Sequence, residues 1–305
     1  MRTGVLGLVI VLVGQAGGFA QLASRIASGQ PTISISVFVT DARGNPATSI
    51  GDTDLLIEDE QQPRDVIRVT HDTTPLRLGV VIDRSNSQRA SDLYKSGLHE
   101  LNMFLTQVLR EESDEVFIEV FDTAPDRPLP WMARNELGQV QLNARPGGGS
   151  SLFDSIDLAC KERFGDSESP SRRVLILLTD GEDNQSRINL DDAITAAQRA
   201  KAAVFAVSTR ENQNGYGRND SERAADTVLR KLADSTGGYA FLELGPKQIS
   251  KAFLQIVAQL DSIFDLVFIP TPAANREQPH TLAVRSASGS KLRVHAAKRY
   301  YATIQ

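Results

Sequence analysis

Three loops in the middle of the chain carry the side chains that could take part in chemistry. The first places Asp83, Ser85 and Ser87 on alternate residues, so that one carboxylate and two hydroxyls can converge as the chain turns. The second is a run of three glycines followed by Ser150, and the third supplies a second carboxylate, Asp180. Carboxylate and hydroxyl oxygens are the ligands that a hard cation such as Mg²⁺ prefers. The three loops together therefore predict a cation site.

Each loop taken alone also has a purely structural explanation. Serine and aspartate are common N-caps before helices, and an Asp-Gly pair is an ordinary turn. Capping, however, does not require all three loops in one chain, each next to a buried strand or the start of a helix. Their joint occurrence favours the cation site over the capping explanation.

The elements between Leu76 and about Ile263 are predicted to alternate between strand and helix. The segments Arg77–Ile82 and Val174–Leu178 are continuous apolar runs, as expected for strands that are buried on both faces. Apolar residues at helical spacing follow them. The pattern predicts an α/β fold with a doubly wound, mainly parallel sheet of the Rossmann-like kind. Ligands of such sheets bind beyond the carboxyl ends of the strands, which is where the three loops would meet.

The segments on both sides of this region have a β pattern. Residues 33–70 contain three short strands, the last two on either side of the polar turn Asp59–Pro63. Residues 265–305 contain three more, the last over Leu292–Tyr300. Three short strands bury too little apolar surface to offset the loss of chain entropy. We therefore expect the two flanks to pack together as one small β-sandwich beside a central domain of residues 76–263.

The composition is that of a globular protein with a mild excess of acidic residues. The 305 residues carry a formal net charge of −5, which disfavours nucleic acid as a partner because phosphate binding needs a basic face. The single cysteine, Cys160, excludes an intramolecular disulfide and a cysteine-based metal site. The four histidines are scattered along the sequence, so a zinc site is not expected. They are His71, His99, His280 and His295.

The first twenty residues have the order of a secretory signal peptide. A short positive start is followed by the apolar run Val5–Val13 and then by small residues up to Ala20. The run is shorter than the roughly 20 residues that span a bilayer, and no cysteine follows it as a lipoprotein anchor would require. We expect cleavage after Ala20 and export to the periplasm, cell surface or medium, with no transmembrane segment in the mature chain. An uncleaved anchor or a buried first helix is the alternative.

The three motifs together resemble those of a known family. The motifs Asp83–Ser87, Gly148–Asp154 and Leu178–Gly181 are similar, in spacing and strand context, to the von Willebrand factor type A domain. The signature of that domain is the metal-ion-dependent adhesion site. The resemblance covers residues 76–263. More loosely, the flanks are similar to those of the exported bacterial VWFA-related group.

The resemblance implies a role for each of the five residues. Asp83 would hold the cation partly through water, Ser85 and Ser87 would coordinate through their hydroxyls, and Asp180 would be the distal carboxylate. Ser150 stands where the family usually has threonine, which keeps the hydroxyl but loses a methyl group that restricts χ1. In the family, the open coordination position takes an acidic residue of a partner protein.

The expected function is therefore Mg²⁺-dependent protein binding or adhesion rather than catalysis, with Mn²⁺ or Ca²⁺ as alternative ions. A metal-dependent hydrolase such as a phosphohydrolase is a second hypothesis. Such enzymes usually have another carboxylate two residues after the first, where this chain has Ser85, and no general base accompanies the loops. A structural scaffold that leaves the site empty is the third.

Overall fold

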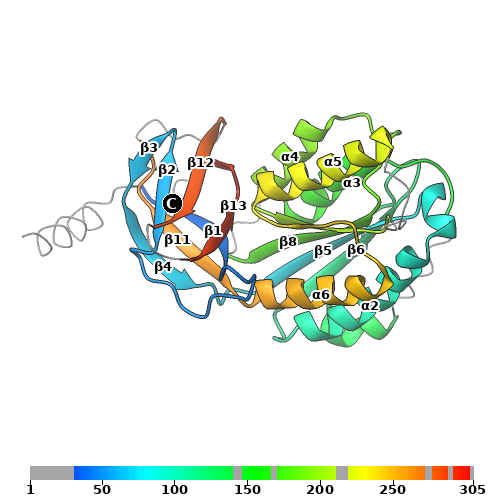
Figure 1. Ribbon diagram of the computed structural model, residues 1–305, viewed down its shortest axis with the longest axis horizontal. Coiled ribbons are helices and arrows are strands. Elements are labelled where there is room, and N and C mark those ends of the chain that lie inside the picture. The colour runs from blue at the N-terminus through cyan, green and yellow to red at the C-terminus, as the bar shows by residue number, and fades with distance from the viewer. Residues whose placement is uncertain are drawn as a thin grey trace, which may run out of the picture.

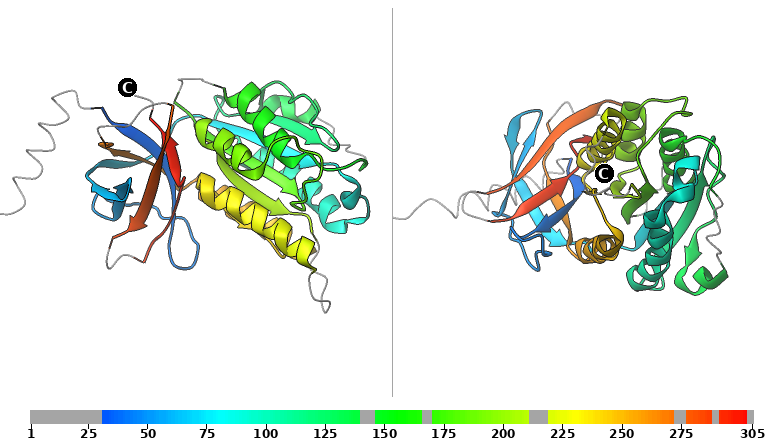
Figure 2. Two further views of the ribbon diagram at one scale, coloured as in Figure 1. Left: turned by 90° about the horizontal axis from the view of Figure 1, so that it is seen from above. Right: turned by 45° about the vertical axis from the view of Figure 1, so that its right-hand side comes forward.

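The computed structural model describes residues 31–139, 146–165, 170–210, 219–271, 277–287 and 291–302. The described chain forms a parallel-sheet domain with a β-sandwich beside it (Figure 1). Figure 2 shows this side-by-side arrangement from two further directions. The expected signal peptide, residues 1–20, lies outside the described residues.

A six-stranded sheet forms the centre of the larger domain. Its order is β10-β9-β8-β5-β6-β7, and only the edge strand β7 runs antiparallel to its neighbour. The inner strands β5 and β8 are buried along almost their whole length, as strands between two helical layers must be. The bounds are β5 (Leu76–Asp83), β6 (Glu115–Phe121), β7 (Met132–Ala133), β8 (Arg172–Thr179), β9 (Ala203–Ser208) and β10 (Ala240–Phe241).

Helices cover both faces of this sheet (Figure 1). The helices α2 (Asp92–Val108) and α6 (Pro246–Leu260) pack on one face, and α3 (Leu152–Ala159), α4 (Leu190–Arg199) and α5 (Asp220–Thr236) pack on the other. Side chains of β5 alternate between the two apolar cores, because successive residues of a strand point to opposite faces. Three short helical turns complete the domain: η1 (Asn86–Ala90), η2 (Arg134–Gln139) and the π-helical η3 (Cys160–Phe164).

The smaller domain is built from strands at both ends of the described chain. One of its sheets has the order β13-β1-β11-β4 and the other β14-β12-β2-β3, with antiparallel pairing throughout. Apolar side chains from both sheets form one shared core. The strands are β1 (Ile33–Thr40), β2 (Leu55–Asp59), β3 (Gln62–Arg64), β4 (Val66–His71), β11 (Ile263–Phe268), β12 (Pro279–Ser286), β13 (Arg293–Ala296) and β14 (Arg299–Tyr301). The predicted fold class is confirmed.

Two local expectations in the sandwich were wrong. The polar segment expected to be only a turn contains β3, because Glu60 and Gln61 alone make the turn and Pro63 can lie in an edge strand. The single strand expected over Leu292–Tyr300 is two strands in different sheets. The chain leaves the first sheet at Ala297, which bridges to Thr236 of α5. β13 therefore pairs with β1, and β14 pairs with β12.

Apolar and charged contacts join the two domains. The ring of Phe38 on β1 meets Phe205 on β9 edge to face, with centroids 5.2 Å apart. The Arg199 guanidinium on α4 lies over the ring of Tyr301 on β14, 4.1 Å from its centroid. None of the helices in the described ranges is long and apolar enough to cross a membrane.

Candidate metal centre at the carboxyl edge of the sheet

Two carboxylates lie at the carboxyl ends of the central strands. Asp83 is the last residue of β5, and Asp180 directly follows β8. The two strands are parallel neighbours with Ile82 opposite Leu178, so both carboxylates come to the same edge. Burial raises the pKa of Asp83 to about 6, and the neighbouring charge of Asp180 acts in the same direction. The two carboxylates are therefore close enough to repel each other.

Hydrogen bonds fix the orientation of the Asp83 carboxylate. The backbone N–H of Ser85 donates to Oδ1 at 2.8 Å, and the hydroxyl of Thr179 donates to Oδ2 at 2.6 Å. The Gln88 amide lies 3.4 Å from the same Oδ2. Asp83 is completely buried. Its position is thus determined by the fold before any ligand binds.

The side chains of Ser85 and Ser87 in the first loop point toward each other. The hydroxyls of Ser85 and Ser87 are 2.9 Å apart. The loop is tied to the glycine segment through two backbone bonds, from Asn86 N–H to the Gly148 carbonyl at 3.1 Å and from Gly147 N–H to the Arg84 carbonyl at 2.8 Å. These bonds bring the first and second loops together.

Ser150 connects the glycine segment to the third loop. Its hydroxyl donates to the Glu182 carbonyl at 2.6 Å, and its own carbonyl accepts 2.9 Å bonds from the N–H groups of Asn184 and Gln185. The preceding Gly149 is needed for this approach, because a Cβ there would lie 2.5 Å from the side chain of Gln185. The absence of a side chain at Gly149 therefore lets the glycine loop and the third loop come into contact.

Asp180 is held from two sides. The Glu182 N–H donates to its Oδ1 at 3.1 Å, and the Arg210 guanidinium donates to its backbone carbonyl at 2.9 Å. Arg210 also pairs with the carboxylates of Glu182 at 3.4 Å and Glu222 at 3.9 Å. Among the described residues no ion pair joins the carboxylate of Asp83 or Asp180 to a lysine or arginine.

All five residues singled out in the sequence thus lie on one edge of the sheet, and a fourth loop was missed. It follows β9 and contributes Arg210 together with Thr209, whose hydroxyl donates to the Gln88 side chain at 2.7 Å. The position of this loop could have been inferred from the sequence, because β9 is an apolar strand next to β8 and its carboxyl end must reach the same edge. The contacts of Arg210 could not. Thr209 bonds to Gln88, which lies beside Asp83, and Arg210 bonds to the backbone carbonyl of Asp180. Neither residue is a candidate ligand of the ion.

A sequence comparison identifies this domain. The family model of the von Willebrand factor type A domain matches residues 78–253, which is more than half of the chain. The chain belongs to this family. Domains of the von Willebrand factor type A family commonly mediate protein interaction and adhesion.

Two curated proteins have similar sequences. A UPF0353 protein of Mycolicibacterium vanbaalenii is 25% identical over 198 residues, and one of Mycolicibacterium gilvum is 26% identical over 199 residues. In both cases the match covers 59% of this chain and 59% of the relative. The chain thus matches less than two thirds of the length of these relatives.

The solved structures that match this chain are more distant in sequence. A von Willebrand factor type A protein from Catenulispora acidiphila is 13% identical with a TM-score of 0.47, covering 90% of this chain and 75% of that one. An aerotolerance-related membrane protein from Bacteroides fragilis, carrying multiple mutations to serine, is 17% identical with a TM-score of 0.44. That match covers 60% of this chain and 98% of the other. No functional statement follows from likenesses at this level.

The donor set of this von Willebrand factor type A domain fits a hard divalent cation. The two carboxylates and three hydroxyls offer only oxygen ligands. Oxygen ligands favour Mg²⁺ over softer metal ions. Three of the four histidines lie in sandwich strands, namely His71 in β4, His280 in β12 and His295 in β13. The fourth, His99, is an exposed residue of α2. The donor set at the edge is therefore unsuited to a zinc-type centre.

Proposed function

We propose that the chain is an Mg²⁺-dependent protein-binding module. Asp83, Ser85, Ser87, Ser150 and Asp180 would hold the ion, and an acidic side chain of the partner protein would supply a further oxygen ligand. The observation that carries the proposal is the pair of buried carboxylates at one edge with no lysine or arginine in the described chain paired to either. Burying two like charges is costly unless a cation compensates them.

The charge count supports a partner carboxylate. Two aspartates balance one divalent ion, and three hydroxyls add ligands without adding charge. An incoming carboxylate then meets a site that is nearly neutral rather than strongly negative, and it can replace a bound water as an oxygen ligand. A site with a third protein carboxylate would repel such a partner.

Ser150 affects the strength of the site rather than its type. A serine hydroxyl can take more than one rotamer, whereas a threonine loses that freedom through its extra methyl group. In this chain the hydroxyl donates to the Glu182 carbonyl, which orients it without the methyl group. We propose that this bond takes over the positioning role.

Export forms part of the proposal, because residues 1–20 have the pattern of a signal peptide and an adhesive module is useful outside the cell. The hydrolase alternative has less support. The position that would carry its second carboxylate is Ser85. The other two carboxylates of the third loop already have partners: Glu182 is paired with Arg210, and Asp183 accepts hydrogen bonds from the Phe153 N–H and the Ser186 hydroxyl.

Calorimetric titration of the mature protein with Mg²⁺ tests the metal site, and capture of envelope proteins with and without EDTA tests the partner. Asp180→Asn should abolish both Mg²⁺ binding and EDTA-sensitive capture. Asp191→Asn is the matched control, since it removes the same charge from an exposed position in α4. Capture that is unaffected by EDTA and by Asp180→Asn would contradict the proposal, and metal-dependent phosphatase turnover would favour the hydrolase instead.

A further inference from the structure

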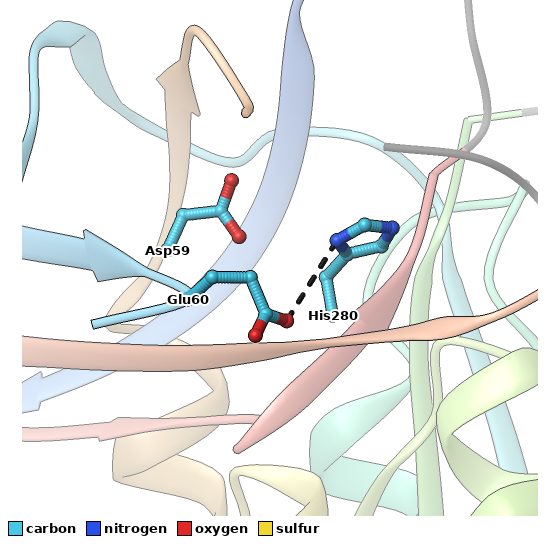
Figure 3. Close-up of side chains that lie close together, drawn as sticks. All are labelled: Asp59, Glu60 and His280. Atoms are coloured by element: carbon cyan, nitrogen blue, oxygen red, sulfur yellow. Dashed lines mark ion pairs between the residues drawn. The ribbon is translucent and has the colours of Figure 1, made fainter. Parts of the chain in front are cut away.

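A second group of metal-ligand side chains lies in the β-sandwich, which contains neither of the two carboxylates described above. Asp59, Glu60 and His280 each offer one ligand atom, and these three atoms lie within 4.8 Å of one another. Figure 3 shows the three side chains turned toward a common space between β2 and β12. Among the described residues it is the one group of three such side chains arranged in this way.

Strand register brings Asp59 and His280 together although 220 residues separate them in the chain. β12 pairs antiparallel with β2, and Leu282 stands opposite Asp59. His280 is two residues from Leu282 and therefore points to the same face of the sheet as Asp59. This face is the inner one, because Leu282 belongs to the core of the sandwich.

Glu60 reaches the same space from the hairpin turn between β2 and β3. Its N–H donates to the Thr281 carbonyl at 3.0 Å, and its Oε1 accepts a bond from the Thr281 N–H at 2.6 Å. The side chain is thus folded back over β12. The same Oε1 lies 3.8 Å from Nδ1 of His280.

The Asp59 carboxylate has one oxygen that the protein does not satisfy. Oδ2 accepts bonds from the Tyr300 hydroxyl at 3.0 Å and the Thr271 N–H at 2.6 Å, and it lies 4.0 Å from Nε of Arg64. Oδ1 is buried and has no hydrogen-bond partner in the described part of the chain. A buried carboxylate oxygen without a partner is costly, so Oδ1 is poised for a ligand.

The distances suit a small ion. A separation of 3.8 Å between Oε1 and Nδ1 is too long for a hydrogen bond, but two ligands on one zinc ion, each about 2.1 Å from it, lie roughly 3.4 Å apart. Glu60 is exposed and can move by that difference. One imidazole with two carboxylates is a ligand set for Zn²⁺ and similar transition metals rather than for Mg²⁺.

We propose that Asp59, Glu60 and His280 form a second metal site, which binds a divalent transition-metal ion such as Zn²⁺. The ion joins the β2–β3 hairpin to β12, and Tyr300 adds β14 because its hydroxyl holds the Asp59 carboxylate. Strands from the two ends of the chain are thereby cross-linked in one sheet. Before the ion binds, the carboxylates of Asp59 and Glu60 and the guanidinium of Arg64 together carry a net charge of −1. This negative charge favours binding of a cation.

The test uses the full mature chain with Asp83→Asn and Asp180→Asn, so that the candidate magnesium site does not contribute. Zn²⁺ is titrated by calorimetry, and Co²⁺ is used as a spectroscopic probe of a low-coordinate protein site, which absorbs visible light far more strongly than the hydrated ion. The parent should bind one Zn²⁺ and show visible Co²⁺ absorption. Glu60→Gln should weaken Zn²⁺ binding at least tenfold, since it removes a charge but keeps the acceptor for Thr281, and His280→Gln should abolish the Co²⁺ signal.

Glu58→Gln is the matched control. It removes the same charge two residues away on β2, where Glu58 pairs with Arg285 instead of facing His280, and it should leave Zn²⁺ affinity unchanged. No Zn²⁺ binding by the parent, or equal affinity in Glu60→Gln and Glu58→Gln, would overturn the proposal. Because the parent lacks both edge aspartates, these outcomes are independent of whether the protein-binding function is correct.

Discussion

A buried carboxyl group should make the stability of the parallel-sheet domain fall as pH rises. Glu119 lies on β6 between Phe117 and Phe121, on the face covered by α3, and is 1% exposed. Neither of its oxygens has a hydrogen-bond partner in the described residues, and the nearby Ser155 hydroxyl donates to the Ser151 carbonyl. Burial raises the pKa of Glu119 from 4.5 to about 9.

The sign and size of the effect follow from proton linkage. Between pH 4.5 and pH 9 the folded protein keeps a proton on Glu119 that the unfolded chain releases, so the free energy of unfolding falls with pH. Each pH unit costs about 1.4 kcal/mol. Stability that is fully present below pH 4.5 is therefore reduced by about 3 kcal/mol at pH 7, as an upper limit.

Glu119→Gln removes the proton exchange while keeping a neutral side chain of the same shape. Its free energy of unfolding should equal that of the wild type near pH 4.5 and exceed it by about 3 kcal/mol at pH 7. Urea unfolding in EDTA, followed by the fluorescence of Trp131, measures both. Trp131 is the only tryptophan and packs 5.0 Å from the ring of Phe117 in the same domain.

Glu115→Gln is the control for this experiment. Glu115 is on the same strand but is partly exposed and paired with Arg77 at 3.2 Å. Its replacement should therefore not produce a gain in the free energy of unfolding that increases with pH. A Glu119→Gln variant whose difference from wild type is the same at pH 4.5 and pH 7 would refute the linkage. A variant less stable than wild type at pH 7 would show that the native carboxyl is ionised and has a partner.

Three further predictions concern the candidate magnesium site and the sandwich. Burial and the charge of Asp180 raise the pKa of Asp83 to about 6, so protons compete with the ion for this carboxylate. The Mg²⁺ affinity measured by calorimetry should therefore fall about tenfold per pH unit below pH 6 and stay constant above pH 7. Ser150→Ala should weaken Mg²⁺ binding about tenfold through loss of one oxygen ligand, and Ser150→Thr should preserve it; equal affinities in both variants would exclude the hydroxyl as a ligand. Deleting residues 265–305 removes most of β11 and all of β12, the partners of β1 and β2, so limited proteolysis should then cut the N-terminal strands. Unchanged protection would show that these strands fold alone.

The parallel sheet and its polar edge could be predicted because both are encoded locally. Continuous apolar runs mark β5 and β8, and the rule that their carboxyl ends share an edge places Asp83 and Asp180 together without any knowledge of side-chain contacts. The glycines before Ser150 were recognisable as a loop. The close approach of Gly149 to Asn184 and Gln185 was not, since it depends on how the second and third loops pack.

The sandwich was harder to predict in detail because its pairing is long-range. Period two identifies a strand but not its neighbour, and the division of the last segment at Ala297 depends on a bridge to Thr236 in another domain. Arg210 was missed for a related reason. An arginine after a strand has many ordinary roles, and only the packed loops show its bond to the Asp180 carbonyl.

The two candidate metal sites therefore differ in how the sequence encodes them. The five oxygens at the sheet edge come from three short motifs, so the chemistry is visible in the order of residues. Asp59 and His280 meet only through the pairing of β2 with β12, and a one-residue slip of that register would turn His280 to the opposite face. The scattered positions of the histidines in the sequence gave no sign of this proposed site, because the approach of His280 to Asp59 depends on the strand register. It follows that a substitution which shifts the β2–β12 register should remove Zn²⁺ binding. It should leave intact the three loops of the candidate magnesium site, which follow β5 and β8 and precede α3.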